Sequence, residues 1–449
     1  MSLIATDNVI LIAGGGITGL SVARYLSKIG RRFCVYDSRD EDAIARAVNN
    51  IDESAACYLG EFRSSYLNGV SGVVMSPGIS MGTELVRQAQ LLNIPIKSEI
   101  KLFLESTSAR VVGITGSNGK STVTTIVGLA AKHAGLRCAV GGNLGVPALD
   151  LLSDDIDLYV LELSSFQLET TEDAGLFVAA HLNLSPDHLD RHGTMHEYFR
   201  IKQKIFHSAK RVVYKLSEPL TQPPRIESVK RYGFGLSASV EKNEEQFSLT
   251  PDRKQLVHDG VTLMHASDIK QKGAHNTENI LAAFAIAEAA EIPSASVAEL
   301  ATSFSGLTHR CEWVTDLRGV TFINDSKATN VGAASAALKG FAYEERPIVL
   351  IAGGEGKGAD FSELAKIIAA TVKSLVLIGE DASAIGGAVG SRVPTHSAKN
   401  LSEAVDISFQ QAESGDIVLF SPACASFDMF ANFEARGEAF KQTVMELSA

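Results

Sequence analysis

The strongest chemical signal in the sequence is a glycine-rich loop that reads GITGSNGKST over residues 113–122. An apolar run precedes it and a helix-like stretch follows, so backbone N–H groups can turn inward around phosphate oxygens at a helix N-terminus. The lysine would then reach the β- and γ-phosphates, and the hydroxyl after it would hold Mg²⁺. Ile114 stands where the strict pattern has its first glycine. The loop predicts phosphate binding, and the competing interpretation is a tight turn with a solvated lysine.

A second glycine-rich loop, GGGITG at 14–19, also lies between an apolar run and a helix-like stretch. Followed by Asp37 at the end of the next strand, this spacing is typical of nicotinamide or flavin sites. Alone, this pattern is weak evidence for such a cofactor. Any nucleotide diphosphate with a ribose would fit the same backbone, and a tight turn that binds no ligand is a further alternative. Asp37, Ser38 and Arg39 suit a uracil-ribose or an adenine-ribose equally well.

Acidic and histidine side chains follow strand-like runs in the middle of the chain. Glu162 ends one run, where a hard oxygen ligand suits Mg²⁺, although an acid bonded to backbone is the alternative. The loop NLSPDHLDRH at 183–192 holds two acids, two histidines and an arginine, a density rarely due to solvation alone. Lys202 lies on a helix-like stretch one turn from Tyr198, and by itself it is interpreted as a surface lysine.

Two loops in the last third of the chain carry lysines, acids and hydroxyls. They read DSKATN at 325–330 and GGEGKGAD at 353–360, and each follows a strand-like run. Ligand sites in open α/β sheets lie beyond the carboxyl ends of the strands, so both loops are candidates for binding a phosphate or a carboxylate. The polar helix start GAHNTEN at 273–279 is either a cap or a contact to a nucleotide base.

Three α/β units would position these loops. At roughly 150 residues per domain, 449 residues correspond to about three domains. Apolar strands that alternate with helical spacers are typical of mostly parallel sheets covered on both faces. We therefore predict an α/β fold with domains at 1–98, 99–308 and 309–449. Residues 211–265, which are polar and alternating, predict hairpins and loops inserted in or appended to the second unit.

The composition of the chain limits which binding partners and which cellular location are expected. Lys and Arg number 41 against 52 Asp and Glu, and the resulting net charge of −11 opposes a large nucleic-acid surface or a polybasic membrane patch. No apolar run approaches the roughly 18 to 20 residues of a spanning helix. The first eleven residues contain Asp7 where a signal peptide has basic residues, so we expect a cytoplasmic protein. Five scattered cysteines favour neither disulfides nor a zinc site.

The combined motifs resemble the Mur ligase family of peptidoglycan synthesis along the whole chain. Besides GITGSNGKST, the resemblance rests on LELSSFQL, DHLDRH, HNxxN, the THR stretch at 308–310, DSKATN, GGxGKGADF and SPACASFD. The SKATN and SPACAS segments are most similar to the branch that adds D-glutamate to UDP-N-acetylmuramoyl-L-alanine. Another amino-acid-adding Mur-type ligase is the alternative, and a Rossmann dinucleotide-dependent oxidoreductase is a more distant one.

The resemblance implies a Rossmann-like UDP-substrate domain, a central P-loop domain for ATP and a Rossmann-like C-terminal domain for the amino acid. It also implies an order of chemistry. The alanine carboxylate attacks the γ-phosphate of ATP to give an acyl phosphate, and the amine of D-glutamate then displaces phosphate through a tetrahedral intermediate. Because two anions must meet, cations must neutralise their charge in a positioned site with little water.

Site residues are carried over by motif position. For ATP the resemblance implies Gly116, Ser117, Asn118, Gly119, Lys120, Ser121, Thr122, Asn276, Arg310 and Asp325. It implies two Mg²⁺ sites, with Ser121 and Glu162 at the first and His188 and Lys202 at the second. Lys202 would be a carbamate formed with CO₂, which turns a cation into an anionic oxygen ligand. Lys204 lies two residues away, and the choice of Lys202 rests on its spacing from Tyr198.

The same carry-over assigns the other two substrates. The residues implied for the UDP moiety are Ile17, Thr18, Asp37, Ser38, Arg39 and Gly78, with Asn143 and Ser164 near the muramoyl substrate or the metal. Those implied for D-glutamate are Lys327, Thr329, Lys357, Ser426 and Phe433. Lys120, His188 and Lys202 are the expected catalytic residues. We further expect a monomer that closes its domains around the substrates and binds neither nucleic acid nor membrane.

Overall fold

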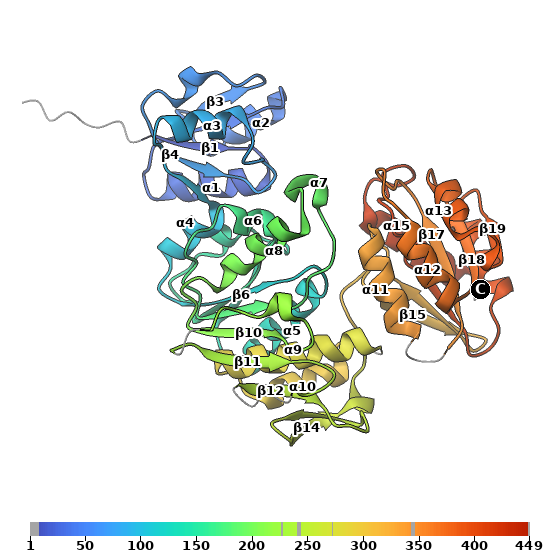
Figure 1. Cartoon of the computed structure of the whole chain (residues 1–449). Helices are drawn as coiled ribbons and strands as arrows, with labels where there is room; N and C mark the ends of the chain where they lie inside the picture. The colour runs from blue at the N-terminus through green and yellow to red at the C-terminus, as the bar shows by residue number, and fades with distance from the viewer. Residues whose placement is uncertain (1–8, 226–227, 240–243, 272, 343–345, 448–449) are drawn as a thin grey trace, which may run out of the picture.

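The computed structural model describes residues 9–225, 228–239, 244–271, 273–342 and 346–447, which form three α/β domains (Figure 1). Each domain is built on its own sheet. Residues 1–8 lie outside the described residues. They include most of the stretch whose sequence argues against a signal peptide. Within them, no helix combines the length and the apolar character needed to cross a membrane.

The N-terminal domain has a five-stranded parallel sheet in the order β3-β2-β1-β4-β5. Its strands are β1 (Val9–Ala13), β2 (Phe33–Asp37), β3 (Ala56–Leu59), β4 (Val70–Met75) and β5 (Ile96–Ser98), and its helices are α1 (Ile17–Lys28), α2 (Asp42–Asn49), η1 (Ser64–Leu67) and α3 (Glu84–Leu91). At Gly19 a Cβ would lie 1.7 Å from the carbonyl oxygen of Gly14. Only glycine therefore lets α1 start this close to β1.

The central domain has a nine-stranded sheet in the order β14-β13-β12-β11-β10-β9-β6-β8-β7. The strands are β6 (Arg110–Thr115), β7 (Cys138–Gly142), β8 (Leu158–Glu162), β9 (Val178–His181), β10 (Arg211–Lys215), β11 (Lys230–Phe234), β12 (Glu245–Leu249), β13 (Gln255–His258) and β14 (Val261–His265). In the region 211–265 the predicted hairpins are found only in part, at β12 to β14. Strands β10 to β12 extend the parallel sheet, and only β12 to β14 are antiparallel.

Helices cover both faces of the central sheet. They are α4 (Glu99–Ser106), α5 (Lys120–His133), η2 (Ala148–Leu151), α6 (Ser165–Glu169), α7 (Leu189–His192), α8 (Met195–Gln203), η3 (Lys204–Phe206), η4 (Pro219–Thr221), η5 (Ala266–Asp268), α9 (Ala274–Ala290) and α10 (Ser294–Ser303). Helix α9 is alanine-rich and mostly buried, which lets it pack closely against α5 and the sheet. Ile12 of the N-terminal domain shares one buried apolar cluster with Phe103 and Tyr159, so the first two domains are packed together.

The C-terminal domain has a six-stranded sheet in the order β15-β16-β20-β17-β18-β19, parallel except at β15. Its strands are β15 (Glu312–Leu317), β16 (Val320–Asn324), β17 (Ile348–Gly353), β18 (Val372–Ile378), β19 (Thr395–Ser397) and β20 (Ile417–Phe420). Its helices are α11 (Val331–Ala342), α12 (Ser362–Thr371), α13 (Ala382–Val389), η6 (Gly390–Arg392), α14 (Leu401–Gln411) and α15 (Phe433–Glu446).

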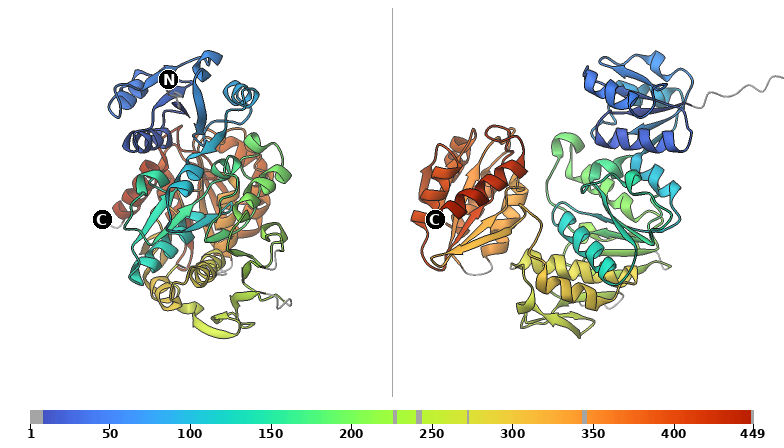
Figure 2. Two further views of the ribbon diagram at one scale, coloured as in Figure 1. Left: turned by 90° about the vertical axis from the view of Figure 1, so that its left-hand side faces the viewer. Right: turned by 180° about the vertical axis from the view of Figure 1, so that it is seen from behind.

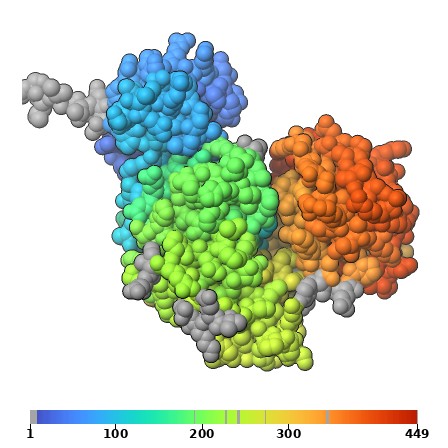
Figure 3. All heavy atoms as spheres, in the orientation of Figure 1, coloured from blue at the N-terminus to red at the C-terminus, as the bar shows by residue number. Residues whose placement is uncertain are grey.

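The C-terminal domain lies beside the central domain, whereas the N-terminal domain lies at one end of it (Figures 2 and 3). Near the joint, His275 of α9 packs against Gly340 of α11, where a Cβ would lie 1.9 Å from the imidazole Nδ1. Trp313 on β15 lines a cavity of about 540 Å³ at this joint together with Lys270 and Asn276 of the central domain. The cavity therefore has walls from both domains.

Candidate active site

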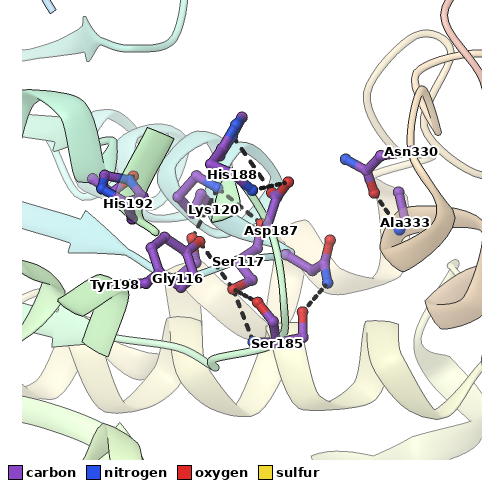
Figure 4. A network of polar contacts seen from close by, with 12 residues as sticks. Gly116, Ser117, Lys120, Ser185, Asp187, His188, His192, Tyr198, Asn330 and Ala333 are labelled. Atoms are coloured by element: carbon purple, nitrogen blue, oxygen red, sulfur yellow. Dashed lines mark hydrogen bonds and ion pairs between the residues drawn. The ribbon is translucent and has the colours of Figure 1, made fainter. Parts of the chain in front are cut away.

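The phosphate loop joins β6 to α5, as its glycines predicted. Gly119 has a φ of 78°, and a Cβ there would lie 2.4 Å from Asn279 Oδ1, so the position requires glycine. Lys120 Nζ donates to the carbonyl oxygens of Gly116 at 2.9 Å and Ser117 at 3.0 Å (Figure 4). Burial lowers the pKa of Lys120. The ammonium group of Lys120 is thus bonded to two carbonyl oxygens of the phosphate loop itself. A phosphate that binds in the loop would compete with these two carbonyls for the ammonium group.

Glu162 faces the start of α5 from the end of the neighbouring strand β8. Its side chain is buried, and it accepts hydrogen bonds from Ser121 Oγ at 2.5 Å and Asn143 Nδ2 at 2.6 Å. Side chains, not the backbone, therefore satisfy this acid. A carboxylate and a hydroxyl in contact are hard oxygen donors of the kind that Mg²⁺ takes. The predicted first metal pair, Ser121 and Glu162, is brought together.

Lys202 is a buried residue of α8 and not a surface lysine. Its Nζ donates to Gly116 O at 2.9 Å and Thr115 Oγ1 at 3.2 Å, and it lies 4.9 Å from the ring centroid of Tyr198. Burial, and then the charge of Lys120, hold the pKa of Lys202 well below its ordinary value. A lysine amine that is easily neutral suits reaction with CO₂. Lys204 instead donates to Glu169 O at 2.6 Å.

His188 caps α7 with a φ of 52° and has an exposed side chain. Its Nε2 lies 3.5 Å from Asp187 Oδ2, and its ring centroid lies 4.8 Å from that of Phe166. Figure 4 shows Asp187 and His188 beside Lys120. Among the described residues, no hydrogen bond or ion pair joins His188 to Lys202, and no group of three or more His, Cys, Asp or Glu side chains could hold a metal.

Sequence reasoning missed the structural role of His192. Its buried ring stacks on Tyr198 with centroids 5.2 Å apart, and its Nε2 lies 3.0 Å from Ser165 Oγ. The Tyr198 hydroxyl lies 3.2 Å from Ser117 Oγ in the phosphate loop. The histidine density of the 183–192 loop was the available signal, but it did not indicate stacking.

A small cavity of about 100 Å³ brings the predicted nucleotide contacts together from two domains. Its lining includes Asn118, Gly119 and Thr122 of the phosphate loop and Asn276, Arg310, Asp325 and Lys327. The carboxylate of Asp325 is buried and accepts a hydrogen bond from Ser421 Oγ at 2.7 Å. Burial raises the pKa of Asp325 to about 6. The N–H of Cys311 donates to its other oxygen, Oδ1, at 3.2 Å, so both oxygens of this acid are already bonded within the C-terminal domain.

A larger cavity of about 610 Å³ lies between the first glycine loop and the loop after β4. It is lined by all six residues predicted for the UDP moiety in the N-terminal domain, namely Ile17, Thr18, Asp37, Ser38, Arg39 and Gly78. Asp37 accepts hydrogen bonds from the N–H of Gly15 at 2.8 Å and from the guanidinium of Arg39. Although burial opposes it, these bonds hold the pKa of Asp37 below its ordinary value.

The two other residues predicted near the substrate lie in the central domain. Asn143 contacts Glu162, and Ser164 caps α6 in a reciprocal pair of hydrogen bonds with Gln167. Asn143 is therefore placed at the first metal pair, Ser164 lies two residues after Glu162 in the chain, and neither residue lines the N-terminal cavity.

Two lysines of the C-terminal domain lie on aromatic rings. Lys327 Nζ is 3.7 Å from the ring centroid of Phe433, and Lys357 Nζ is 5.0 Å from that of Phe427. Such contacts orient a cation without neutralising it. Thr329 is half-buried beside the first lysine, and Ser426 is buried in the loop that carries Phe427.

Arg436, which sequence reasoning also missed, joins these two loops from inside. It is fully buried and donates to the carbonyl oxygens of Ser326, Cys424 and Ala425. Burial lowers its pKa to about 10. In Figure 4, Asn330 and Ala333 of the same domain lie apart from the residues around Lys120.

Three family models match consecutive parts of the chain. They are described as Mur ligase MurD-like, N-terminal domain, at residues 8–98, Mur ligase middle domain, at 114–287, and Mur ligase, glutamate ligase domain, at 309–424. A UDP-N-acetylmuramoylalanine--D-glutamate ligase of Saccharophagus degradans is 50% identical over 454 residues, covering 100% of each chain. The chain belongs to the Mur ligase family. The predicted resemblance is thus confirmed, and the N-terminal match favours a Mur ligase domain over an oxidoreductase.

Further Mur ligases are similar to the chain in sequence or in fold. The enzyme of the same name from Pseudomonas aeruginosa is 43% identical over 451 residues, with both chains fully covered. Among solved structures, a pseudomurein peptide ligase type C from Methanothermus fervidus has a TM-score of 0.60 at 17% identity, covering 98% of this chain and 100% of that chain. MurF ligase from Thermotoga maritima in complex with ADP has a TM-score of 0.60 at 14% identity, covering 92% and 95%. The predicted three-domain α/β architecture is confirmed.

Proposed function

We propose that this Mur ligase adds D-glutamate to UDP-N-acetylmuramoyl-L-alanine with ATP, in the synthesis of peptidoglycan precursors. The observation that carries the proposal is the full-length identity of 50% to a relative named for this reaction. The geometry supports the proposal, because the N-terminal domain has a cavity of about 610 Å³, the central domain a phosphate loop that carries a lysine, and the C-terminal domain two lysines held on aromatic rings. Each anionic substrate thus has a local cation or helix N-terminus, despite a net charge of −11.

In the first step, an oxygen of the alanine carboxylate attacks the γ-phosphorus of ATP, and the bond to the β-phosphate oxygen breaks to release ADP. Lys120 would exchange its two carbonyl partners for phosphate oxygens and offset the charge that the two anions bring together. Ser121 and Glu162 would hold Mg²⁺, which neutralises phosphate charge when bound. The product is the acyl phosphate of the substrate.

In the second step, the amine of D-glutamate attacks the acyl carbon. A tetrahedral intermediate forms, its carbon–oxygen bond to phosphate breaks, and an amide remains, while the proton lost by the amine leaves with the phosphate as hydrogenphosphate. Lys327 and Lys357 would bind the carboxylates of D-glutamate, with Thr329, Ser426 and Phe433 completing that site. Two cations suit an acceptor whose two carboxylates both stay charged.

For the second Mg²⁺ site we propose His188 together with Lys202 as its CO₂-derived carbamate. The lowered pKa of Lys202, which results from burial, supports reaction of its neutral amine with CO₂. His188, whose side chain is exposed at the start of α7 beside Asp187, would supply the imidazole ligand.

The remaining substrate-binding residues are assigned mainly from the lining of the two cavities and from the contacts of Glu162. Ile17, Thr18, Asp37, Ser38, Arg39 and Gly78 would hold UDP, and Asn143 and Ser164 the muramoyl end. Gly116 to Thr122 would hold the phosphates of ATP, and Asn276, Arg310 and Asp325 the rest of the nucleotide. We propose domain boundaries after residues 98 and 308, a cytoplasmic monomer, and domain closure during the reaction, because ATP and D-glutamate bind on different domains.

Phosphate release tests the proposal. The protein is incubated with UDP-N-acetylmuramoyl-L-alanine, ATP and Mg²⁺, and D-glutamate is compared with L-glutamate, L-lysine and meso-diaminopimelate as acceptor. We expect release that depends on both the nucleotide substrate and D-glutamate. Preference for another acceptor would make the chain a different amino-acid-adding ligase, and ATP binding without acceptor-dependent turnover would contradict a ligase altogether.

A further inference from the structure

The side chain of Arg191 connects the N-terminal domain to the central domain at the edge of the UDP cavity. It lies on α7, and only 14% of it is exposed. Its Nη2 donates to Ile79 O at 2.7 Å, and its Nη1 donates to Gly78 O at 3.4 Å. Gly78 and Ile79 follow β4 and line the cavity of about 610 Å³. The guanidinium therefore fixes one wall of that cavity.

The same guanidinium is bonded on its other side to the central domain. Nη2 donates to Glu169 Oε2 at 2.8 Å, and Cζ lies 5.0 Å from the ring centroid of Phe166. The ring centroid of Phe166 lies in turn 4.8 Å from that of His188. Both Phe166 and Glu169 belong to α6, the helix that Ser164 caps. Arg191 thus contacts both the wall of the N-terminal cavity and the helix that directly follows β8, the strand that ends in Glu162.

We propose that Arg191 is a positioning residue that sets the distance between the UDP cavity and the acyl-phosphate site. The inference rests on the proposed function, in which one substrate spans both places. Its uridine end is held in the N-terminal domain, and its carboxylate must meet the γ-phosphate at the central domain. An error of about 1 Å in such an arrangement costs on the order of 100-fold in rate. A planar guanidinium with several fixed donors can hold two carbonyls and a carboxylate, which an ammonium cannot do with the same geometry.

Arg24 provides a matched control. It lies on α1 and bonds to Asp150 of the central domain, with Nη2 2.6 Å from Oδ2 and Nε 3.0 Å from Oδ1. This ion pair also joins the first two domains, but neither residue lines the UDP cavity. Loss of a general interdomain contact can thus be separated from loss of the contact at the cavity wall.

The experiment compares Arg191→Lys with Arg24→Lys. For each, kcat and the KM for UDP-N-acetylmuramoyl-L-alanine and ATP are measured, together with the inhibition constant of UDP, which occupies the cavity without reaching the phosphate loop. For Arg191→Lys we expect kcat to fall about 10-fold or more, with the UDP inhibition constant and the KM for ATP changed less than about 3-fold. All values of Arg24→Lys should stay within about 2-fold of wild type.

Three results would overturn the inference. They are a wild-type kcat in Arg191→Lys, a UDP inhibition constant that rises as much as kcat falls, or an equal loss in Arg24→Lys. The second would assign Arg191 to the cavity wall alone. Melting temperatures show whether a variant is folded, and Arg191→Gln, which keeps donors but no charge, replaces Arg191→Lys if the latter is unstable. Wild-type protein without D-glutamate-dependent phosphate release would overturn the proposed function as well.

Discussion

Lys120 and Lys202 donate to the same carbonyl oxygen, that of Gly116, each at 2.9 Å. Two ammonium groups at one acceptor repel each other, and the charge of Lys120 is the second cause, after burial, of the lowered pKa of Lys202. The phosphate loop therefore contacts two lysines, and burial lowers the pKa of both, that of Lys202 well below its ordinary value.

The first prediction is that Lys202 carries a carbamate. A neutral amine reacts with CO₂, so protein equilibrated with ¹³C-bicarbonate should show a carbamate carbon signal in its NMR spectrum near pH 8. Lys202→Ala should lose this signal and most of its turnover while remaining folded. Lys204→Ala is the control, because Lys204 bonds to Glu169 O and should leave the signal unchanged. A signal that persists in Lys202→Ala, or wild-type turnover in that variant, would remove the carbamate from the mechanism.

The second prediction concerns the first metal pair. Glu162→Gln keeps the volume of a side chain that contacts Ser121 and Asn143 but removes its charge. We expect the Mg²⁺ concentration for half-maximal turnover to rise about 10-fold or more, since an anionic ligand is lost. Turnover is measured over a Mg²⁺ series at fixed ATP, and Ser121→Ala should shift the series in the same direction. An unchanged Mg²⁺ dependence in both variants would argue against a metal at this place.

The third prediction separates acceptor binding from nucleotide binding. Lys327→Ala removes a cation that lies 3.7 Å from the ring centroid of Phe433. The KM for D-glutamate should rise about 10-fold or more, because a charge-assisted hydrogen bond to a carboxylate contributes roughly 1.5 to 3 kcal/mol. ATP affinity should change little. Lys339→Ala removes an exposed lysine of the same domain and should have no such effect. Equal KM values in the two variants would exclude Lys327 from the acceptor site.

The fourth prediction is a pH dependence of stability at Glu99. This acid is buried at the start of α4, accepts a hydrogen bond from the N–H of Leu149 at 2.8 Å, and its pKa is raised by burial to about 7 from 4.5. The folded state therefore binds a proton more tightly than the unfolded state does. Its contribution to the free energy of unfolding is largest below about pH 4.5 and is lost as pH rises through 7.

Glu99→Gln should remove that loss while keeping the acceptor for Leu149. At pH 8 the variant should be more stable than wild type by at most about 3 kcal/mol, and at pH 4.5 the two should be similar. Melting temperatures over this pH range provide the measurement. Glu105→Gln is the control, since Glu105 lies on the same helix in an exposed pair with Lys97. A difference between Glu99→Gln and wild type that does not grow with pH would contradict the prediction.

The loops could be predicted from the sequence because their geometry is local. Gly119 must adopt a positive φ, and a glycine before Lys120 at a strand-to-helix junction specifies this without knowledge of the rest of the chain. The loops that carry Lys327 and Lys357 were predicted in the same way, because strand ends of a parallel sheet meet at one edge. Glu162 was predicted as an oxygen ligand for Mg²⁺ because it stands at the end of an apolar strand.

Contacts between distant segments could not be predicted. The burial of Lys202 depends on α8 packing beneath a loop more than eighty residues earlier, and a helix pattern alone leaves a lysine on the surface. The partners of Arg191 and Arg436 come from other loops, so the local sequence does not indicate which carbonyl oxygens these arginines bind. Strands β10 to β12 are short and border polar turns, so the local pattern favoured hairpins although the strands pair in parallel.

Trp313, the single tryptophan of the chain, lies on β15 at the joint between the central and C-terminal domains. Its side chain is 53% exposed and lines a cavity with walls from both domains. Indole emission changes in intensity and colour with solvent exposure, so any rotation at this joint alters the fluorescence of the whole protein. Stopped-flow mixing with each substrate, followed by the emission of Trp313, therefore tests the proposed domain closure without an added label.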